Sequence, residues 1–491
     1  MIFLSCSSDM YTYNTYHLAK AFFPEEEMQQ NVSEEMEDVF RLTFPDGRVF
    51  AVKAGDIPEG TDRSRKKYAV DAALYKACRE YTGRDLAWGI LTGVRPTKIA
   101  MQKLEQGMDE DSFVRWFQED SFVSRRKAVL AWQVARREKK ILEQLDYRDG
   151  YSLYVGIPFC PSVCSYCSFS SGPIDYWRDS VEDYLKALMK ELSWIGERAA
   201  ERGKRLNTIY IGGGTPTTLE EGQLERLLSH IDRCFSRESL LEYTVEAGRP
   251  DSITEGKLKA LKGHGITRIS INPQTMQQRT LDLIGRGHTA EEIEDSFHMA
   301  RSLGFDNINM DLIAGLPKET AADMADTLEK IGALGPDSLT VHSLAIKRAA
   351  KMGQEKSSTG SIAALAGDPA VMARELSAMI EEAYRAAESM GLSPYYLYRQ
   401  KNIAGNFENV GFAKVDKAGI YNILIMEEKQ SIIAAGAGSS TKILLDEPIP
   451  VPGSRHGRKT TLVRVENVKN IREYIARIDE MINRKGEWLW R

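Results

Sequence analysis

Three cysteines with a regular spacing lie in the middle of the chain. Cys160, Cys164 and Cys167 form the pattern C-x3-C-x2-C directly after a predicted strand. Three thiolates can hold three irons of a four-iron, four-sulfur cluster and leave the fourth iron open to a ligand. Zinc is a weaker interpretation, because no fourth Cys or His lies at the distance typical of a zinc finger. The spacing therefore predicts an iron–sulfur site with an open coordination position.

Glycines and polar residues recur where other predicted strands end. A strand at 208–211 ends in three consecutive glycines, and glycine lets the backbone come close to a ligand. A tight turn is the alternative for the glycines, and each polar residue alone is more often solvated or salt-bridged. These strand-end residues are Gly213, Gly214, Thr215, Glu246, Gln274, Arg286 and Asp311.

A parallel sheet is needed to bring these residues together. From about residue 150, short segments rich in Val, Ile and Tyr alternate with helical patterns, and strands are predicted at 153–155, 208–211, 242–246, 268–271, 307–313 and 338–342. Alternating strands and helices form parallel sheets with right-handed crossovers. Six such units predict an α/β fold with a partial (β/α)6 barrel, because a closed barrel usually takes about eight. The functional residues should gather at the carboxyl ends of its strands.

The flanking segments have other patterns and predict two further domains. Residues 1–149 read as an N-terminal α+β domain with a hairpin at 39–43 and 47–52, and residues 150–347 are the barrel core. Residues 348–491 begin with a Gly/Ser/Ala-rich stretch and read as a mixed C-terminal domain that covers the substrate.

The composition excludes several classes of protein. The chain has 491 residues, of which 42% are hydrophobic and 27% charged, and it contains no apolar run of the roughly 18 residues that a membrane helix needs. The net charge of −5 gives no global attraction to nucleic acid. The N-terminus has no convincing secretion signal, so we expect a cytoplasmic protein without a membrane span.

The cysteine motif resembles that of the radical S-adenosylmethionine superfamily, in which an aromatic residue, here Tyr166, precedes the last cysteine. The resemblance implies a 4Fe-4S cluster held by the three cysteines and S-adenosyl-L-methionine on the open iron. It also implies an electron donor such as a flavodoxin or ferredoxin. The cofactors carry the chemistry, while the protein binds, orients and excludes water.

Within that superfamily, the chain resembles the oxygen-independent coproporphyrinogen III oxidase family from Tyr154 to Ala345. The motifs IGGGTPT, IGR and MDLIAGLP carry this resemblance. The resemblance implies that the strand-end residues Gly213, Gly214, Thr215, Glu246, Gln274, Arg286 and Asp311 bind S-adenosylmethionine, together with Tyr154, Tyr166 and Ala345. It also gives Tyr154 a catalytic role.

Two positions depart from the family pattern. Gly156 stands where family members commonly have a histidine, so a proton-donating role of that residue is absent. Phe169 stands where many have a fourth cysteine. We expect the cluster to survive both changes, whereas the oxidase activity is put in doubt by the first.

The resemblance implies oxidative decarboxylation of coproporphyrinogen III to protoporphyrinogen IX by a 5′-deoxyadenosyl radical in haem biosynthesis. Its alternatives are a haem-binding chaperone and another radical reaction on a tetrapyrrole, such as methyl transfer or ring opening. In the segment 396–402, aromatic side chains alternate with cations, which suits a flat, carboxylate-bearing ring. The alternative is that this segment is an ordinary packed strand. If the segment binds the substrate, Arg399 is the candidate catalytic residue that contacts a propionate.

Overall fold

The computed structural model describes the chain except residues 25, 94, 345–349, 351, 353–368, 400–407, 452–458 and 491. The chain forms two compact units. The N-terminal unit consists of Met1–Arg137, Asp368–Ser377 and Leu397–Asn409, and the barrel unit consists of Glu138–Gly367, Ala378–Tyr396 and Val410–Arg491. The division into three domains stays a prediction.

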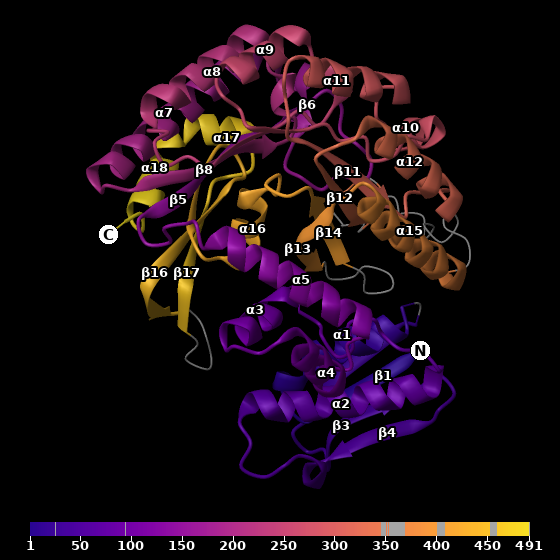
Figure 1. Ribbon diagram of the computed structural model, residues 1–491. Coiled ribbons are helices and arrows are strands. Elements are labelled where there is room, and N and C mark those ends of the chain that lie inside the picture. Colours follow the sequence, from indigo (N-terminus) through magenta and orange to yellow (C-terminus); the bar gives the residue numbers. More distant parts are fainter. Residues whose placement is uncertain are drawn as a thin grey trace. The chain divides into compact units, whose positions relative to one another are not determined.

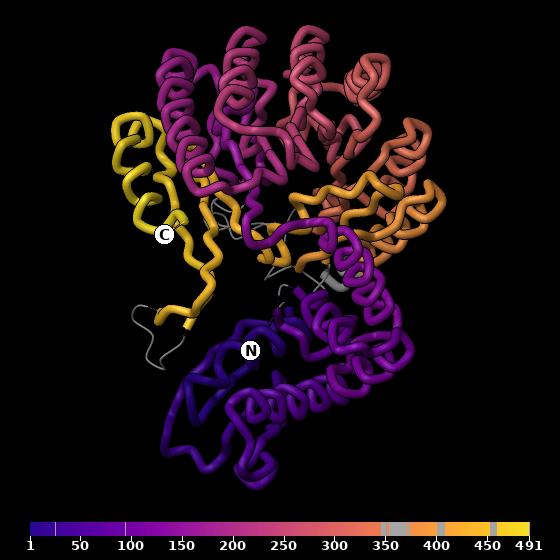
Figure 2. Tube along the Cα trace, turned by 60° about the vertical axis from the view of Figure 1, so that its left-hand side comes forward, coloured from indigo at the N-terminus to yellow at the C-terminus, as the bar shows by residue number. Residues whose placement is uncertain are grey.

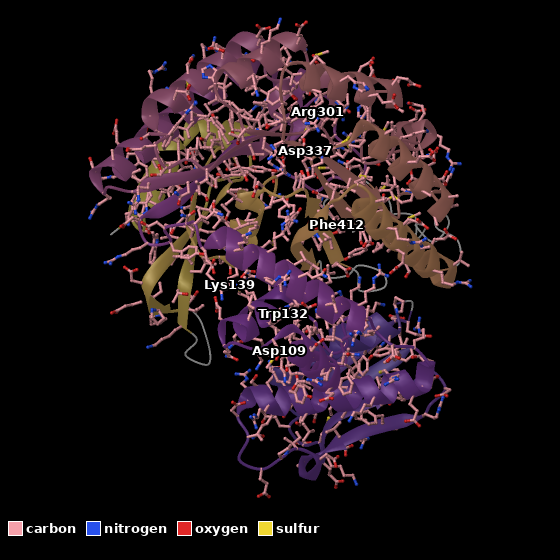
Figure 3. All side chains as sticks on the ribbon, viewed as in Figure 1. Asp109, Trp132, Lys139, Arg301, Asp337 and Phe412 are labelled. Carbon is pink, nitrogen blue, oxygen red and sulfur yellow. The ribbon has the colours of Figure 1, made fainter. Side chains whose placement is uncertain are left out.

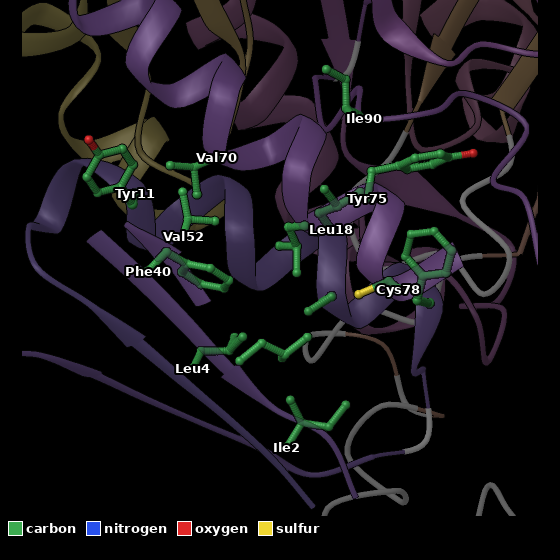
Figure 4. Packing of buried hydrophobic residues seen from close by; sticks show 14 of the residues in the cluster. Ile2, Leu4, Tyr11, Leu18, Phe40, Val52, Val70, Tyr75, Cys78 and Ile90 are labelled. Atoms are coloured by element: carbon green, nitrogen blue, oxygen red, sulfur yellow. The ribbon is translucent and has the colours of Figure 1, made fainter. Parts of the chain in front are cut away.

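The N-terminal unit is built on a four-stranded sheet of order β2-β1-β3-β4. Its strands are β1 (Ile2–Cys6), β2 (Met28–Val32), β3 (Asp38–Thr43) and β4 (Val49–Lys53), and β3 and β4 form the predicted antiparallel hairpin. Alternate side chains of β1 and β3 point into a core with α1 (Asp9–Phe22) and α2 (Arg63–Thr82), in which Leu4, Phe40 and Leu18 are fully or almost fully buried (Figure 4). The unit also contains α3 (Thr97–Glu105), α4 (Glu110–Ser121) and the first part of α5 (Arg125–Leu142).

The barrel unit contains six parallel strands that are neighbours in chain order. They are β5 (Gly150–Ile157), β8 (Arg205–Gly213), β9 (Glu242–Glu246), β10 (Arg268–Ser270), β11 (Ile308–Ala314) and β12 (Ser338–Ser343). Helices cover their outer face in a row (Figures 1 and 2), namely α7 (Val181–Glu201), α8 (Glu221–Cys234), α9 (Glu255–Gly263), α11 (Ala290–Ser302) and α12 (Ala321–Leu334). The predicted α/β fold with six strand-helix units is confirmed.

Local residue types explain where these elements begin and meet. Thr289 starts α11 with a capping box, in which its hydroxyl accepts from the Glu292 backbone N–H and its own N–H donates to the Glu292 carboxylate. At the base of β12, Asp337 pairs with Arg301 of α11 at 2.6 Å (Figure 3). This ion pair ties a covering helix to the sheet.

The sheet continues beyond both ends of the six-stranded core, so the barrel remains open. β12 pairs with β14 (Glu408–Ala413), outside which lies β13 (Ser393–Arg399). At the other end β5 pairs with β15 (Ser431–Ala435), followed by β16 (Ser440–Pro450) and β17 (Lys459–Glu466). The segments after the core thus satisfy the backbone groups of both outer strands, which an edge would leave unpaired.

Short helices complete the barrel unit. They are α6 (Ile174–Trp177), α10 (Gln278–Leu283), α16 (Ile420–Glu427), α17 (Ile471–Ala476) and α18 (Ile478–Gly486), and α15 (Pro369–Ser389) lies beside α12 (Figure 1). In the described part of the chain, no helix is both long and apolar enough to span a membrane.

Candidate active site

The cysteine loop follows β5 and is fixed at both of its sides. Cys160 lies in the short strand β6 (Phe159–Cys160), which pairs with β7 (Gly172–Pro173) and so closes the loop on itself. On the far side, the Ser165 backbone N–H donates to the Ile284 carbonyl at 3.0 Å. The three thiols therefore sit on a loop whose ends are held by backbone hydrogen bonds.

The cysteines differ in burial, since Cys164 is buried whereas Cys160 and Cys167 are partly exposed. Cys164 is 8% exposed, and the three thiols interact electrostatically. Burial raises the pKa of the Cys160 and Cys167 thiols. Among the described residues, no group of three Cys, His, Asp or Glu side chains converges to hold a single metal ion. A four-iron cluster sets a different requirement, because each thiolate binds a different iron.

The glycine loop after β8 packs directly against the cysteine loop. The backbone N–H groups of Gly214 and Thr215 donate to the carbonyls of Ile157 and Phe159, each at 2.7 Å. A Cβ on Gly214 would lie 2.4 Å from the Phe159 carbonyl oxygen, and Gly213 has a φ of +108°. Thr215 Oγ1 donates to the Cys160 sulfur at 3.6 Å. The glycines thus position the cysteines, in addition to the ligand contact predicted for them.

Two carboxylates lie on neighbouring parts of the barrel interior with opposite pKa shifts. Burial raises the pKa of Glu246 to about 7, helped by the charge of Asp311 and opposed by a hydrogen bond from the Tyr210 hydroxyl. Burial also acts to raise the pKa of Asp311, but hydrogen bonds from His342 and Asn309 outweigh it and hold that pKa below its usual value. The interior therefore combines an ionised carboxylate with one that titrates near neutrality.

Gln274 and Arg286 belong to the loops that follow β10. Gln274 has a φ of +68° and continues the ladder to β11, since its N–H donates to the Asp311 carbonyl at 2.9 Å. Arg286 is 5% exposed and donates to the Tyr166 hydroxyl at 3.1 Å and to the Asn272 carbonyl at 2.6 Å. Arg286 thus connects the cysteine loop to the barrel.

Three stacked tyrosines line the barrel beside Glu246. Tyr154 of β5 and Tyr210 of β8 have ring centroids 6.2 Å apart, and Tyr421 of α16 stacks on Tyr210 at 4.5 Å. The α16 backbone is held there by Glu242, which accepts from the N–H of Ile420. Sequence reasoning missed Tyr210 and Tyr421, although the position of Tyr210 two residues before the glycine loop was a usable signal.

Arg249 is a third residue that sequence reasoning missed. Its guanidinium is 3% exposed and donates to the Cys164 sulfur at 3.6 Å and to the Ser162 hydroxyl at 3.2 Å. Asp251 pairs with it at 2.5 Å. Its place three residues after Glu246, in the same loop, was the available signal.

Gly156 of β5 is enclosed by the neighbouring strand β15, which comes from the C-terminal part of the chain. β15 pairs with β5 so that a Cβ on Gly156 would lie 3.3 Å from the Ala435 carbonyl oxygen and 3.5 Å from the Tyr154 ring. Its neighbour in the register is Gly212 of β8. A side chain at this position, where family oxidases commonly have histidine, would therefore pack tightly against β15.

Two predicted site residues are not part of the described barrel unit. Ala345 falls outside the described residues. Arg399 belongs to the N-terminal unit, is 3% exposed and donates to the Leu91 carbonyl at 2.8 Å. Desolvation by burial lowers its pKa to about 10. The remaining predicted residues belong to the barrel unit, around the carboxyl ends of its strands.

Comparisons with known proteins agree with this geometry. The profile of the Radical SAM superfamily matches residues 154–331. The oxygen-independent coproporphyrinogen-III oxidase-like protein HemZ of Bacillus subtilis is 40% identical over 393 residues, which are 79% of this chain and 76% of that protein. The heme chaperone HemW of Bacillus subtilis is 39% identical over 197 residues, which are 40% of this chain and 51% of that protein. Among solved structures, the coproporphyrinogen III oxidase HemN from Escherichia coli is similar, with a TM-score of 0.52 and 22% sequence identity. The match covers 70% of this chain and 73% of the HemN chain.

The fold and the cysteine loop thus define a radical SAM protein. More narrowly, the chain belongs to the family of oxygen-independent coproporphyrinogen III oxidase-like proteins that includes HemZ.

The residues present fit the cofactors of this superfamily, a 4Fe-4S cluster and S-adenosylmethionine. The thiols of Cys160, Cys164 and Cys167, which share one loop, would supply three cluster ligands. Beside them, Gly212 of β8 lies against Glu246, whose carboxyl would be 3.1 Å from a Cβ on Gly212. A side chain at Gly212 would therefore occupy space beside the Glu246 carboxyl that a ligand would need.

Proposed function

We propose that this protein catalyses the oxidative decarboxylation of coproporphyrinogen III to protoporphyrinogen IX without oxygen, in the cytoplasm. The observation that carries the proposal is the cysteine loop packed on a glycine loop at the carboxyl ends of barrel strands, next to Glu246 and Asp311. The name of HemZ, with which the chain shares 40% identity, supports the choice of substrate.

The cysteines and the barrel residues would divide the work of holding the cofactors. Cys160, Cys164 and Cys167 hold the cluster, and Arg249 places a positive charge against the sulfur of Cys164. The ionised carboxylate of Asp311 suits an amino or hydroxyl group of S-adenosylmethionine. Arg286 orients Tyr166 by a hydrogen bond to its hydroxyl, and the backbone of Gly213 and Gly214 would contact the methionine part of the cofactor. Ala345 and Gln274 complete the proposed binding set.

When bound, the two cofactors supply a 5′-deoxyadenosyl radical that takes a hydrogen atom from the β-carbon of a propionate. That propionate then loses carbon dioxide and passes one electron to an external one-electron acceptor, which leaves a vinyl group, and the same reaction occurs at a second propionate. The chain's part is to orient the propionate and to exclude water. We assign Tyr154 to the side of the barrel interior that faces the reacting groups, because its ring stacks on that of Tyr210, which is hydrogen-bonded to Glu246.

Arg399 remains the proposed partner of a propionate, although it also binds backbone carbonyls of its own unit. Its Nη1 donates to backbone carbonyls of Leu91 and Gly93, so it organises the loop after Trp88 within the N-terminal unit. Arg399→Ala should leave the iron content and the uncoupled cleavage of S-adenosylmethionine unchanged, while it lowers vinyl formation.

A haem chaperone is the second candidate, and two observations favour it. HemW is 39% identical over 197 residues, and Gly156 replaces a histidine that the oxidases commonly have. Anaerobic incubation with coproporphyrinogen III, reductant and S-adenosylmethionine separates the candidates. Protoporphyrinogen in the chromatogram supports the decarboxylase, whereas tight haem binding without any vinyl product supports the chaperone. Methylated or ring-opened products would indicate another radical reaction on a tetrapyrrole.

A further inference from the structure

A set of partly exposed side chains lines the interior of the barrel. The strands β5, β8, β9, β11 and β12 are buried along most of their length, but each carries one polar side chain that is partly exposed. These side chains are Tyr154, Tyr210, Glu246, Asp311 and His342. Polar side chains that stay accessible inside a barrel are available to a bound ligand.

Two members of this set are joined by a hydrogen bond between neighbouring strands. The Tyr210 hydroxyl of β8 donates to the Glu246 carboxylate of β9, which also accepts from the backbone N–H of Gly213. Gly212 makes this contact possible, because a Cβ there would lie 2.8 Å from a ring carbon of Tyr210 and 3.1 Å from the Glu246 carboxyl. The glycine loop and Tyr210 together fix the orientation of the Glu246 side chain.

Two further tyrosines hold the Tyr210 ring. The rings of Tyr154 and Tyr421 stack on it with interplanar angles of 14° and 22°, at centroid distances of 6.2 Å and 4.5 Å. Tyr421 comes from α16, and its backbone N–H donates to the Glu242 carboxylate at 3.4 Å, which anchors the first turn of that helix. The stacked rings leave Tyr210 little freedom to turn its hydroxyl away from Glu246.

The groups that face the Glu246 carboxyl come from β5, β8, β11, β12 and α16. They are Tyr154, Tyr210, Gly213, Asp311, His342 and Tyr421. Burial, helped by the charge of Asp311, raises the pKa of Glu246, and the hydrogen bond from Tyr210 is the strongest influence that lowers it. The charge of His342 acts in the same direction as Tyr210. Without the Tyr210 hydroxyl, the balance moves toward the protonated carboxyl.

We propose that Tyr210 is a positioning residue of the cofactor site, which keeps the Glu246 carboxylate oriented and ionised for S-adenosylmethionine. The inference rests on the proposed function in one respect, namely that Glu246 contacts this cofactor. Tyr210 acts through Glu246 and needs no contact with the reacting atoms. The cofactor carries a positive charge and an amino group, so an ionised carboxylate binds it more tightly than a neutral one.

The test measures the protonation of Glu246 and the affinity for the cofactor separately, both in the reconstituted holoenzyme. Difference infrared spectra report the protonation of the carboxyl, and the Glu246→Gln variant assigns its band. Calorimetric titration with S-adenosylmethionine from about pH 6 to about pH 9 measures the affinity.

Two substitutions of buried tyrosines by phenylalanine are compared. Tyr210→Phe removes the hydroxyl that Glu246 accepts from and keeps the stacked ring. Tyr243→Phe is the matched control, because Tyr243 of β9 is fully buried and its hydroxyl has no hydrogen-bond partner among the residues that the structure describes. A third variant, Tyr421→Leu, removes a ring that stacks on Tyr210.

We expect Tyr210→Phe to move the midpoint of the Glu246 titration upward by about one pH unit, because the ionised form loses a charge-assisted hydrogen bond. Its affinity for S-adenosylmethionine should fall about fivefold near pH 7 and approach the wild-type value at higher pH. Tyr421→Leu should shift the midpoint in the same direction by less, and Tyr243→Phe should match the wild type.

A Glu246 titration that is unchanged in Tyr210→Phe would overturn the inference, as would a loss of affinity that is equal at every pH, which a merely structural role would give. A shifted titration with wild-type affinity in both Tyr210→Phe and Glu246→Gln would also overturn it, because Glu246 would then not contact the cofactor. The proposed decarboxylation is judged by its products, which enter neither measurement, so its failure is seen separately.

Discussion

At the scale of single residues, the cysteines carry the most direct prediction. Cys164→Ala should remove the cluster, because two thiolates leave two irons without a protein ligand and the loop is built around all three. Anaerobically reconstituted wild type should bind about four irons.

The matched control is Cys234→Ala, a thiol of α8 that lies near His230 and outside the cysteine loop. Its iron and sulfide content should equal that of the wild type. A Cys164→Ala variant with a complete, redox-active cluster would contradict the assignment.

Glu246 predicts a pH dependence of cofactor binding. Because burial raises its pKa to about 7, the carboxyl is largely protonated below that pH and ionised above it. If the ionised form binds the cofactor, affinity should rise as the pH increases from about 6 to about 8. The same shift makes the contribution of Glu246 to folding stability fall as the pH rises from 4.5 through about 7.

Calorimetric titration of S-adenosylmethionine at several pH values tests this. Glu246→Gln should bind more weakly at high pH and show a flatter profile over this range. An unchanged affinity and slope in the variant would mean that Glu246 does not contact the cofactor.

The residues that sequence reasoning missed share a physical cause. The cysteines can be predicted from the sequence because their spacing is local. The strand-end residues can be predicted because the carboxyl ends of parallel strands lie at one edge of the sheet. Arg249 and Tyr421 act only through contacts formed by folding, with Cys164 and with Tyr210. No periodic pattern marks such residues.

At the scale of elements, the contact between the glycine loop and the cysteine loop decides the geometry of the site. Gly214→Ala should lower cluster loading and the melting temperature, because its Cβ would lie 2.4 Å from the Phe159 carbonyl and the backbone must shift. Iron analysis and thermal unfolding measure both effects.

Gly222→Ala is the matched control, since a Cβ there meets nothing within 4 Å and the position lies in α8. Alanine is the better helix former, so stability should stay equal or rise slightly. Full iron loading of Gly214→Ala would show that the two loops are less tightly coupled than the hydrogen bonds indicate.

The order of the six parallel strands could be predicted from the sequence. The pairing of later strands with the two outer strands of this core could not. The alternation of strand and helix patterns predicts all six parallel strands in the observed order. β15 has the composition of an ordinary buried strand, and its pairing with β5 over a long sequence separation has no local signal. The same pairing encloses Gly156, a position at which motif comparison alone shows only that the histidine is missing.

At the scale of the whole molecule, a buried ion pair ties the last helix to the barrel. Lys485 of α18 and Glu191 of α7 are fully buried and paired, and Glu191 also accepts from the Tyr474 hydroxyl at 2.6 Å and from the Gly436 N–H at 2.9 Å. Lys485→Met leaves the Glu191 charge buried without its cation. It should cost about 3–5 kcal/mol of unfolding free energy.

Denaturant unfolding measures this cost, and Lys190→Met is the control. Lys190 pairs with Asp479, but both side chains are more than half exposed, so its loss should cost about 0–1 kcal/mol. Equal effects of the two substitutions would mean that the buried pair does not hold the C-terminal helix in place.

The central claim, radical decarboxylation of coproporphyrinogen III, is tested most directly by following the propionate carboxyl carbon. Coproporphyrinogen III labelled in these carboxyl groups is incubated anaerobically with the reduced holoenzyme, with and without S-adenosylmethionine. We predict labelled carbon dioxide that depends on S-adenosylmethionine, is absent in Cys164→Ala and accompanies vinyl formation. Cleavage of S-adenosylmethionine by a fully loaded wild type, with no labelled carbon dioxide released, would contradict the claim.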